Sequence, residues 1–499
     1  MPVSDLVFQD ASHLAKAIRE RSVSAKEVLE AHLAQIAQHN RVLNAIVTLN
    51  EEQAQERASQ ADAALARQEL WGPLHGVPFT VKDLFDTARM RTTWSYRPLA
   101  NYIPQQDATA VARLRSVGAI LIGKTNMPQL AVGPQCDSPL FGRANNPWNL
   151  NCTPGGSTGG GAAAVAAGLS PLEIGSDLGG SIRLPAHFCG VFGFKPTEHR
   201  VSMAGASLRL KEAKGGFGHM RVAGPIARSV EDLRLGLSLI EGPDGRQWSV
   251  PPVAPQMSQE RPLREYRFAW SDNFGGIGVT AETRTALEKL AVTLEQLGCR
   301  VEYCNPQSLN FTAALQNFGE ICGTEIGVRT PPHKRFLLSM VLRARSFDEP
   351  LFRGLVKGAA LSMQGYVEAL EKRNAFITIM EQFISNWDGW LCPVAPGPAF
   401  THRQMRNPLL GSPLEVDDQK LPYWVWSLTY TAIFNLTGNP AVVLPLARSQ
   451  AGLPIGVQLV GQRWRDVELL NLAHKLVEVT GLFQRPTLNL HKTNCGDVI

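Results

Sequence analysis

Glycine is concentrated in one part of the sequence, and this concentration constrains the fold more than any other feature. Residues 155–161 read Gly-Gly-Ser-Thr-Gly-Gly-Gly, and residues 179–181 read Gly-Gly-Ser. Glycine loses more backbone freedom on folding than any other residue, so dense runs indicate that backbones must approach closely or adopt positive φ. Residues 162–168, between the two runs, predict a tightly packed helix of small residues. The chain must therefore fold around two crowded loops that each carry a serine.

The remaining sequence alternates helical and strand patterns, which is typical of an α/β protein. Strands are predicted at residues 76–81, 119–122, 266–270, 440–446 and 455–461. Helices are predicted at 51–68 and 107–117, from Asp466, and after the N-capping residues Ser24 and Thr280. Because no internal repeat or long polar linker interrupts this alternation, we predict one continuous domain over residues 1–499.

Charge, cysteine and hydropathy patterns argue against several functional classes. The 499 residues carry a net charge of +5 without a Lys/Arg run of the kind that follows a phosphate backbone, so we expect no nucleic-acid partner. The eight cysteines form no C-x-x-C pair, and no histidine cluster has zinc-ligand spacing, so we expect neither a metal nor a cofactor. Since there is no signal peptide and no long apolar run, we expect a soluble, cytoplasmic protein without membrane contacts.

A nucleotide-binding motif is formally present at residues 118–125, which read Gly-Ala-Ile-Leu-Ile-Gly-Lys-Thr. A phosphate cradle needs a polar, turning loop between a strand and a helix. Here the four intervening residues are apolar and belong inside a sheet, and Pro128 follows where the helix should run. We therefore predict no nucleotide site at this position.

Residues 155–159 match G-x-S-x-G, the nucleophile elbow of α/β-hydrolases, and this match would make Ser157 the nucleophile of an esterase. That elbow requires a preceding apolar strand and, later in the chain, an acid and then a histidine. Residues 149–154 are typical of a turn, and none of His402, His474 and His491 lies in a recognisable loop. This interpretation is kept as a remote alternative.

A third interpretation uses both glycine-flanked serines. Ser181 follows Asp177-Leu-Gly-Gly180, so successive N–H groups can turn toward one point beside its hydroxyl, as the oxyanion of an acyl-transfer reaction requires. A serine hydroxyl becomes a good nucleophile only when a base takes its proton. Because no histidine is credible in that role, a desolvated lysine is the remaining candidate, and Ser157 could relay the proton.

Three segments resemble the signature motifs of the amidase signature family. Lys82 lies in Gly-Val-Pro-Phe-Thr-Val-Lys-Asp, Ser157 in Pro-Gly-Gly-Ser-Thr-Gly-Gly, and Ser181 in Gly-Ser-Asp-Leu-Gly-Gly-Ser-Ile-Arg. The spacings of 75 and 24 residues between them are also typical of that family. Further matches lie at residues 123–126, 146–149, 190–197, 434–438 and 452–459. The similarity covers nearly the whole chain, with a signature core over about 70–230, and it is least distinct over about 245–390, which we expect to shape the substrate site.

The resemblance implies a fold, a reaction and a set of site residues. The fold would be a single large α/β domain whose central mixed β-sheet is covered by helices on both faces. Ser181 would attack the carbonyl of a carboxylic amide, and neutral Lys82 would act as general base through Ser157, whose peptide bond with Gly156 is expected to be cis. No metal or cofactor would take part. The oxyanion hole would consist of the N–H groups of Leu178, Gly179, Gly180 and Ser181.

Four neighbouring residues are expected to support this site. Asp177 and Arg183 would form a structural ion pair that steadies the loop of the nucleophile. Ser176 would either hydrogen-bond the Lys82 amine or be satisfied within its own loop, and Thr158 keeps a hydroxyl where the family usually has a second serine. A lysine ordinarily has a pKa of about 10.4, so burial must lower the pKa of Lys82 for it to act as a base near neutrality.

The substrate is less constrained than the chemistry. The A subunit of the glutamine-dependent tRNA amidotransferase shares these motifs and places an acidic residue for the glutamine ammonium where this chain has Leu428. The preceding residues are aromatic, Tyr423-Trp-Val-Trp426, and such an uncharged wall favours an apolar or bulky acyl group, although it is equally typical of ordinary core. We therefore expect a free-standing amidase for a small-molecule amide, with a homodimer left open. The glutaminase subunit is the alternative, and a catalytically silent binding protein is a more distant one.

Overall fold

An eleven-stranded sheet forms the centre of the structure, a computed structural model that describes residues 3–210, 213–214, 218–254, 261–328, 330, 340, 349–404 and 411–487. In spatial order its strands are β1 (Ile46–Leu49), β3 (Ile120–Thr125), β2 (Pro78–Lys82), β6 (Leu172–Asp177), β10 (Val222–Ala227), β7 (Phe192–Lys195), β16 (Ala441–Arg448), β17 (Pro454–Val460), β13 (Gly389–Pro393), β11 (Arg267–Trp270) and β12 (Arg300–Tyr303). Strands from distant parts of the sequence therefore meet in the middle of one sheet.

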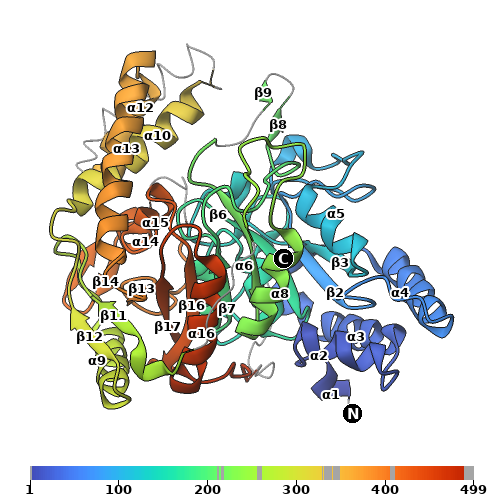
Figure 1. Ribbon diagram of the computed structural model, residues 1–499. Coiled ribbons are helices and arrows are strands. Elements are labelled where there is room, and N and C mark those ends of the chain that lie inside the picture. Colours follow the sequence, from blue (N-terminus) through green and yellow to red (C-terminus); the bar gives the residue numbers. More distant parts are fainter. Residues whose placement is uncertain are drawn as a thin grey trace, which may run out of the picture.

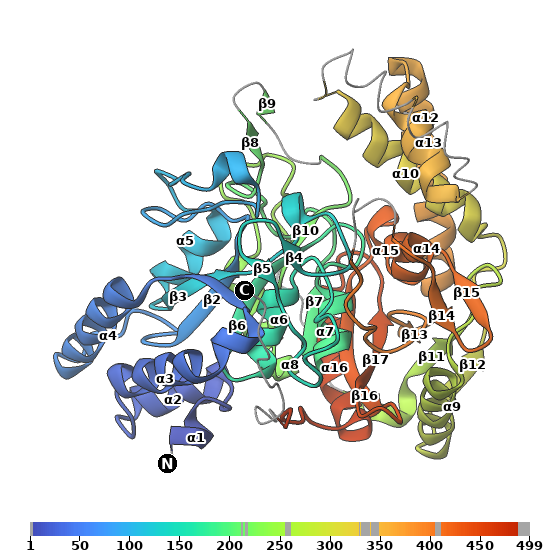
Figure 2. The same cartoon turned by 180° about the vertical axis from the view of Figure 1, so that it is seen from behind.

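The sheet is mixed and has helices on both faces (Figures 1 and 2). β2 runs parallel to β3 and β6, and β11 runs parallel to β12 and β13, whereas the other neighbouring pairs are antiparallel. On one face α8 (Val230–Ile240), α16 (Asp466–Thr480) and α9 (Ala281–Gln296) form a contiguous layer, and on the other α6 (Gly159–Ala166) contacts α7 (Arg183–Cys189). The predicted single α/β domain with a mixed central sheet is thereby confirmed.

The remaining elements lie around this sheet. The helices of the N-terminal half are α1 (Val3–Leu6), α2 (Ala11–Arg19), α3 (Ala25–Leu43), α4 (Glu51–Ala66) and α5 (Thr109–Ser116), and those of the C-terminal half are α10 (Phe311–Gly327), α12 (Pro350–Ala359), α13 (Met363–Ile384), α14 (Tyr423–Leu428) and α15 (Ala432–Leu436). Three small hairpins pair β4 (Asp137–Ser138) with β5 (Gly142–Arg143), β8 (Arg209–Leu210) with β9 (Ala213–Lys214), and β14 (Leu414–Val416) with β15 (Gln419–Leu421). No helix in the described ranges is long and apolar enough to cross a membrane.

The two predicted N-caps differ in the structure. Ser24 caps α3 as part of a complete capping box: its hydroxyl accepts from the Glu27 N–H, and the Glu27 carboxylate accepts from the Ser24 N–H. Thr280 precedes α9 as predicted, but its hydroxyl bonds that of Thr283 and caps no backbone N–H. The position of the second helix start was therefore right, and its capping mechanism was wrong.

The dense glycines allow α6 to lie against neighbouring backbone and side chains. A Cβ on Gly160 would come within 2.5 Å of the backbone nitrogen of Asn126, and one on Gly161 would come within 2.5 Å of the Glu173 carboxyl group. Real Cβ atoms do not approach other atoms this closely, so any larger residue would push α6 away from the sheet. The close approach that the glycine runs predicted is confirmed, and it fixes the loop that carries Ser157.

Residues 118–125 do not form a phosphate-binding loop. Residues 120–125 are strand β3, and the Lys124 side chain is fully buried. Its amine donates to the Phe85 carbonyl at 2.5 Å and to the Thr92 hydroxyl at 2.9 Å, so it lies inside the protein and not at a nucleotide site. The expectation that the apolar residues of this motif belong inside the sheet is confirmed.

Helices α10, α12 and α13 stand together at one edge of the molecule, next to α14 and α15 (Figures 1 and 2). α10 and α12 approach closely because glycines face the opposite backbone: a Cβ on Gly354 would lie 2.0 Å from the Gln316 carbonyl oxygen, and one on Gly323 would lie 2.3 Å from that of Leu355. This helical layer has its own apolar core, which includes Phe318. It belongs to the stretch where the family resemblance is least distinct.

Candidate active site

Lys82 is the last residue of β2, and its side chain is fully buried. Its amine donates to the Ser157 hydroxyl at 2.7 Å, to the Thr158 hydroxyl at 3.0 Å and to the Ser176 hydroxyl at 3.2 Å. Ser176 reaches it because β6 runs parallel to β2, so that both strands end at the same edge of the sheet. Of the two expectations for Ser176, contact with the lysine amine is the one that the structure supports.

The surroundings of Lys82 favour its neutral form. Burial, together with the positive charge of Arg221, lowers the pKa of Lys82 to about 7. The negative charges of Asp177 and Glu173 act in the opposite direction, but they do not offset the loss of hydration. A neutral amine can accept a proton, so the site has a lysine that can act as a base near pH 7.

Ser157 lies on the loop immediately before α6, and its side chain is almost fully buried. The Gly156–Ser157 peptide is cis, as the resemblance implied. In the described part of the chain Lys82 is the side chain that hydrogen-bonds the Ser157 hydroxyl, and no histidine does so. The arrangement that an α/β-hydrolase elbow requires is therefore not found around Ser157.

Ser181 follows β6 on a half-buried loop, so it is more accessible than Ser157. Its carbonyl oxygen accepts from the Thr158 N–H at 3.1 Å, and this bond joins the two serine loops. None of the described residues hydrogen-bonds the Ser181 hydroxyl. The structure thus brings Lys82 and Ser157 into contact and leaves the hydroxyl of Ser181 available to a substrate.

The N–H groups proposed for the oxyanion hole are not equivalent. The Gly180 N–H donates to the Asp177 carboxylate at 2.8 Å, so we correct the expectation that it is free to bind an oxyanion. For the N–H groups of Leu178, Gly179 and Ser181, the described residues provide no acceptor. Three N–H groups therefore remain candidates for an oxyanion site, because the fourth is bonded to Asp177 and holds the loop in place.

Asp177 and Arg183 form the predicted ion pair, and both side chains are fully buried. The Arg183 guanidinium also donates to the side-chain oxygens of Asn435 at 2.6 Å and Gln458 at 3.1 Å. The Asn435 amide in turn donates to the Asp177 carboxylate at 2.9 Å. Both amide residues lie in segments that match the family, at 434–438 and 452–459, but the sequence alone did not indicate that they support the nucleophile loop.

Glu173 is a second residue that sequence reasoning missed. It faces Thr80 across the β2–β6 pair and is fully buried near Lys82. One carboxyl oxygen accepts from the Thr125 hydroxyl at 2.8 Å, and the other has no hydrogen-bond partner among the described residues. Burial raises the pKa of Glu173 to about 7. A glutamate inside a strand is a signal of such a residue, because burial of a carboxyl group costs free energy unless its surroundings stabilise it.

Tyr423 and Trp426 of the aromatic run belong to the core, whereas Leu428 lies beside the proposed site. Tyr423 and Trp426 are buried against Phe400, so they are ordinary core and do not form an open wall. Leu428, at the end of α14, is half-buried, and its side chain would lie 3.0 Å from a Cβ on Gly179. An apolar side chain thus faces the proposed oxyanion loop, at the position that the sequence analysis matched to an acidic residue of the amidotransferase subunit.

The described residues contain no group of three or more His, Cys, Asp or Glu side chains that could hold a metal ion. Seven cysteines in these ranges are free thiols, all of them buried except the half-buried Cys304, and Cys495 lies outside the described residues.

Known proteins resemble this chain in both sequence and fold. The sequence model of the amidase family matches residues 27–470. The A subunit of the glutamyl-tRNA(Gln) amidotransferase from Geotalea daltonii is 32% identical over 495 residues, covering 94% of this chain and 96% of the relative. The structure of 6-aminohexanoate cyclic dimer hydrolase superposes with a TM-score of 0.79 at 25% identity, covering 97% of this chain and 99% of that one. A bacterial aryl acylamidase of the amidase signature family shares the fold, with a TM-score of 0.81 at 23% identity over 98% and 99% of the two chains.

These relatives correct the expectation about partners. Several of them are named as the A subunit of a glutamyl-tRNA(Gln) amidotransferase, and relatives named for a tRNA enzyme contradict the exclusion of nucleic acid. The exclusion relied on the lack of a Lys/Arg run. A Lys/Arg run is expected in a chain that itself contacts the phosphate backbone of a nucleic acid. Its absence does not exclude a chain whose partner subunits make that contact.

Proposed function

Because this chain belongs to the amidase signature family, we propose that it hydrolyses a carboxylic amide through an acyl-enzyme on Ser181, with Lys82 as general base. The observation that carries this proposal is the contact between the buried Lys82 amine and the Ser157 hydroxyl, at 2.7 Å. The lowered pKa of Lys82 supports it, since a base must be unprotonated at the working pH.

In the proposed reaction, the neutral Lys82 amine takes the Ser157 proton while Ser157 takes the proton of Ser181. The Ser181 oxygen attacks the amide carbonyl, and the N–H groups of Leu178 and Gly179, with that of Ser181 itself, stabilise the oxyanion. When the intermediate collapses, the C–N bond breaks, and the proton held on Lys82 passes back through Ser157 to the leaving nitrogen. Water then attacks the acyl-enzyme by the same route and releases the carboxylic acid.

The relatives favour a more specific version of this function over a free-standing amidase. Their names support the interpretation that this chain is the amide-hydrolysing subunit of a glutamyl-tRNA(Gln) amidotransferase. In that case the substrate would be glutamine, and partner subunits and tRNA would be needed for the complete reaction. The match over 94% of this chain and 96% of the relative supports a shared architecture from end to end.

A free-standing amidase is the second candidate, and the position of Leu428 favours it. A glutamine ammonium needs a negatively charged or strongly polar partner, and Leu428 offers neither beside Gly179. An apolar acyl group would gain from contact with Leu428 and with Phe318, whose ring also faces Gly179. On this interpretation the substrate is an amide of an apolar acid.

One set of assays separates the two candidates. The purified chain would be given glutamine and a series of aryl and alkyl amides, first alone and then with the other subunits of a glutamyl-tRNA(Gln) amidotransferase. Hydrolysis of glutamine only in the presence of these subunits would establish the subunit function. Hydrolysis of apolar amides by the chain alone would establish the second candidate. Amide hydrolysis that persists in the Ser181→Ala variant would refute the proposed chemistry in both cases.

A further inference from the structure

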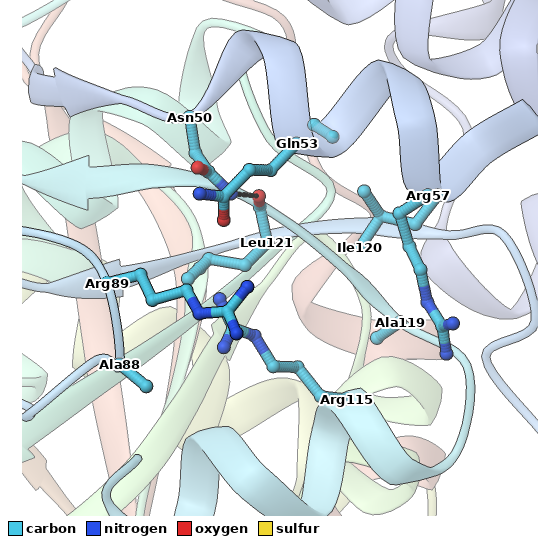
Figure 3. A pocket seen from close by; sticks show the side chains of 10 residues that line it. Asn50, Gln53, Arg57, Ala88, Arg89, Arg115, Ala119, Ile120 and Leu121 are labelled. Atoms are coloured by element: carbon cyan, nitrogen blue, oxygen red, sulfur yellow. Dashed lines mark hydrogen bonds between the residues drawn. The ribbon is translucent and has the colours of Figure 1, made fainter. Parts of the chain in front are cut away.

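A cavity of about 280 Å³ lies near one edge of the sheet, between α4, α5, the start of β3 and the loop at residues 88–89. Figure 3 shows its lining. Its residues are Asn50, Gln53, Ala54, Arg57, Ala88, Arg89, Arg115, Ala119, Ile120 and Leu121. None of them belongs to the proposed catalytic set, so this cavity is a separate site.

Three arginines from three different elements line this cavity. Arg57 comes from α4, Arg89 from the loop and Arg115 from α5, and Figure 3 draws the guanidinium group of Arg57 apart from those of Arg89 and Arg115. Positive charges gathered in one lining raise the local electrostatic potential, and this potential attracts anions. The three arginines therefore favour a negatively charged ligand.

Protein carboxylates neutralise only part of this charge. Arg115 pairs with Asp107 at 2.9 Å, but its side chain stays 30% exposed. Arg57 stacks on Trp71, 3.6 Å from the ring centroid, and neither Arg57 nor Arg89 forms an ion pair with a described carboxylate. The lining contains no Asp or Glu. The three guanidinium groups carry three positive charges and Asp107 neutralises one of them, so two positive charges remain unpaired. In agreement with this, burial and the charge of Arg115 lower the pKa of Arg57.

We propose that this arginine pocket binds the phosphate group of a small phosphomonoester. A phosphomonoester carries a charge of about −1.5 to −2 at pH 7, which matches the two unpaired positive charges, whereas a carboxylate or a phosphodiester carries only one. Its terminal oxygens can accept from several guanidinium groups at once, and arginine binds phosphate by paired N–H donors.

The size and the remaining polar groups fit the same ligand. The cavity is close to the lower end of ligand pockets, roughly 300–1,000 Å³, so it has room for a phosphate and a small attached group. The side-chain amide of Gln53 points toward the cavity near Asn50 in Figure 3, and it can donate to a hydroxyl of the ligand. Arg89 is exposed, which leaves the entrance open to solvent.

The test is calorimetric titration of the full chain with inorganic phosphate and with glycerol 3-phosphate at low ionic strength. Both should bind, and acetate at the same concentration should not. Arg89→Ala and Arg57→Gln should each weaken binding about tenfold or more, because each removes charge-assisted donors. The matched control is Arg353→Ala, an exposed arginine on α12 outside the pocket, and it should change the affinity less than about twofold.

Two further titrations show whether the pocket is independent of the active site and selective for a phosphomonoester. Ser181→Ala protein should bind phosphate as the unchanged chain does, so failure of the proposed function would not affect this result. A short RNA without terminal phosphates supplies only phosphodiesters and should bind weakly. The proposal is overturned if neither phosphate compound binds, if Arg89→Ala binds them unchanged, or if the RNA binds through these arginines while the phosphomonoester does not.

Discussion

Asp177 and Arg183 are joined by a fully buried ion pair, with 3.0 Å between a carboxylate oxygen and a guanidinium nitrogen, and the two residues flank Ser181 on either side. Asp177 also accepts from the N–H groups of Gly180 and Ile182. Through these bonds, the Asp177 carboxylate holds the loop of the proposed nucleophile in place. The charge of Arg183 and these hydrogen bonds hold the pKa of Asp177 well below its usual range, although burial alone would raise it.

Removing the positive charge of Arg183 should destabilise the folded protein. Arg183→Met leaves a buried carboxylate without its partner, and we expect the free energy of unfolding to fall by about 3–5 kcal/mol in urea denaturation at pH 7. Arg465→Met, which breaks an exposed pair with Glu468, is the control and should have little effect. Because the folded-state pKa of Asp177 is lowered, its contribution is present above the ordinary aspartate pKa and is lost as the pH falls through the lowered value. Equal stability of the two variants would contradict the role given to the pair.

The covalent intermediate should form on Ser181. A fluorophosphonate probe should label this residue, because it is half-exposed and its hydroxyl makes no hydrogen bond within the described residues. Ser181→Ala should abolish both labelling and hydrolysis, whereas Ser157→Ala should impair hydrolysis less if water replaces the bridge. Peptide mapping of the adduct is the measurement. An adduct on Ser157 would revive the α/β-hydrolase interpretation.

Leu428 should influence which acyl group is accepted. Leu428→Asp places a carboxylate beside Gly179, so we expect hydrolysis of apolar amides to fall roughly tenfold in kcat/KM relative to that of glutamine. Leu428→Met keeps an apolar side chain of similar volume and should leave the preference unchanged. The ratio of kcat/KM for the two substrates is the readout. If the ratio does not respond to Asp, then Leu428 does not contact the acyl group.

The proposed catalytic residues could be named from the sequence, whereas much of what positions them could not. Lys82, Ser157 and Ser181 were identified because short motifs surround each of them, and local patterns also predicted the strand at 76–81 and the helix after Ser24. Asn435 and Gln458 were not assigned a role, since they reach Arg183 from 252 and 275 residues away and only the fold brings them there.

Geometry also decided questions that residue types left open. Four successive N–H groups looked equivalent in the sequence, but Asp177 takes that of Gly180. Tyr423 and Trp426 suggested a pocket wall, but they pack into the core, while Leu428 at the end of the same helix reaches the site. In each case the outcome depends on where a side chain points, and sequence spacing does not determine that direction.

Glu173 should tune the base. With its own pKa at about 7, Glu173 is ionised in part at the pH where Lys82 titrates, and this negative charge raises the pKa of Lys82. The neutral amide in Glu173→Gln should therefore let the pKa of Lys82 fall. The acidic limb of the kcat/KM profile should then move to lower pH, and the glutamine oxygen can still accept from Thr125. Glu302→Gln, at an exposed position on β12, should leave the limb in place. A limb that stays fixed or moves to higher pH in Glu173→Gln would show that this carboxyl does not act on Lys82.

The central claim is that Lys82 works as a neutral base. Since burial lowers its pKa to about 7, kcat/KM should rise with pH, reach half its plateau near pH 7 and then level off, because the active form is the one that has lost its proton. Lys82→Ala should lose this base altogether while the protein stays folded.

The most direct measurement is kcat/KM of Lys82→Arg above pH 8, with circular dichroism to confirm that the variant is folded. Arginine keeps the positive charge but stays protonated, so it cannot accept a proton from Ser157. We expect a loss of about 10²–10⁴-fold, close to that of Lys82→Ala. Activity of Lys82→Arg within about tenfold of the unchanged enzyme would mean that the residue supplies only positive charge. It would contradict the mechanism proposed for this site.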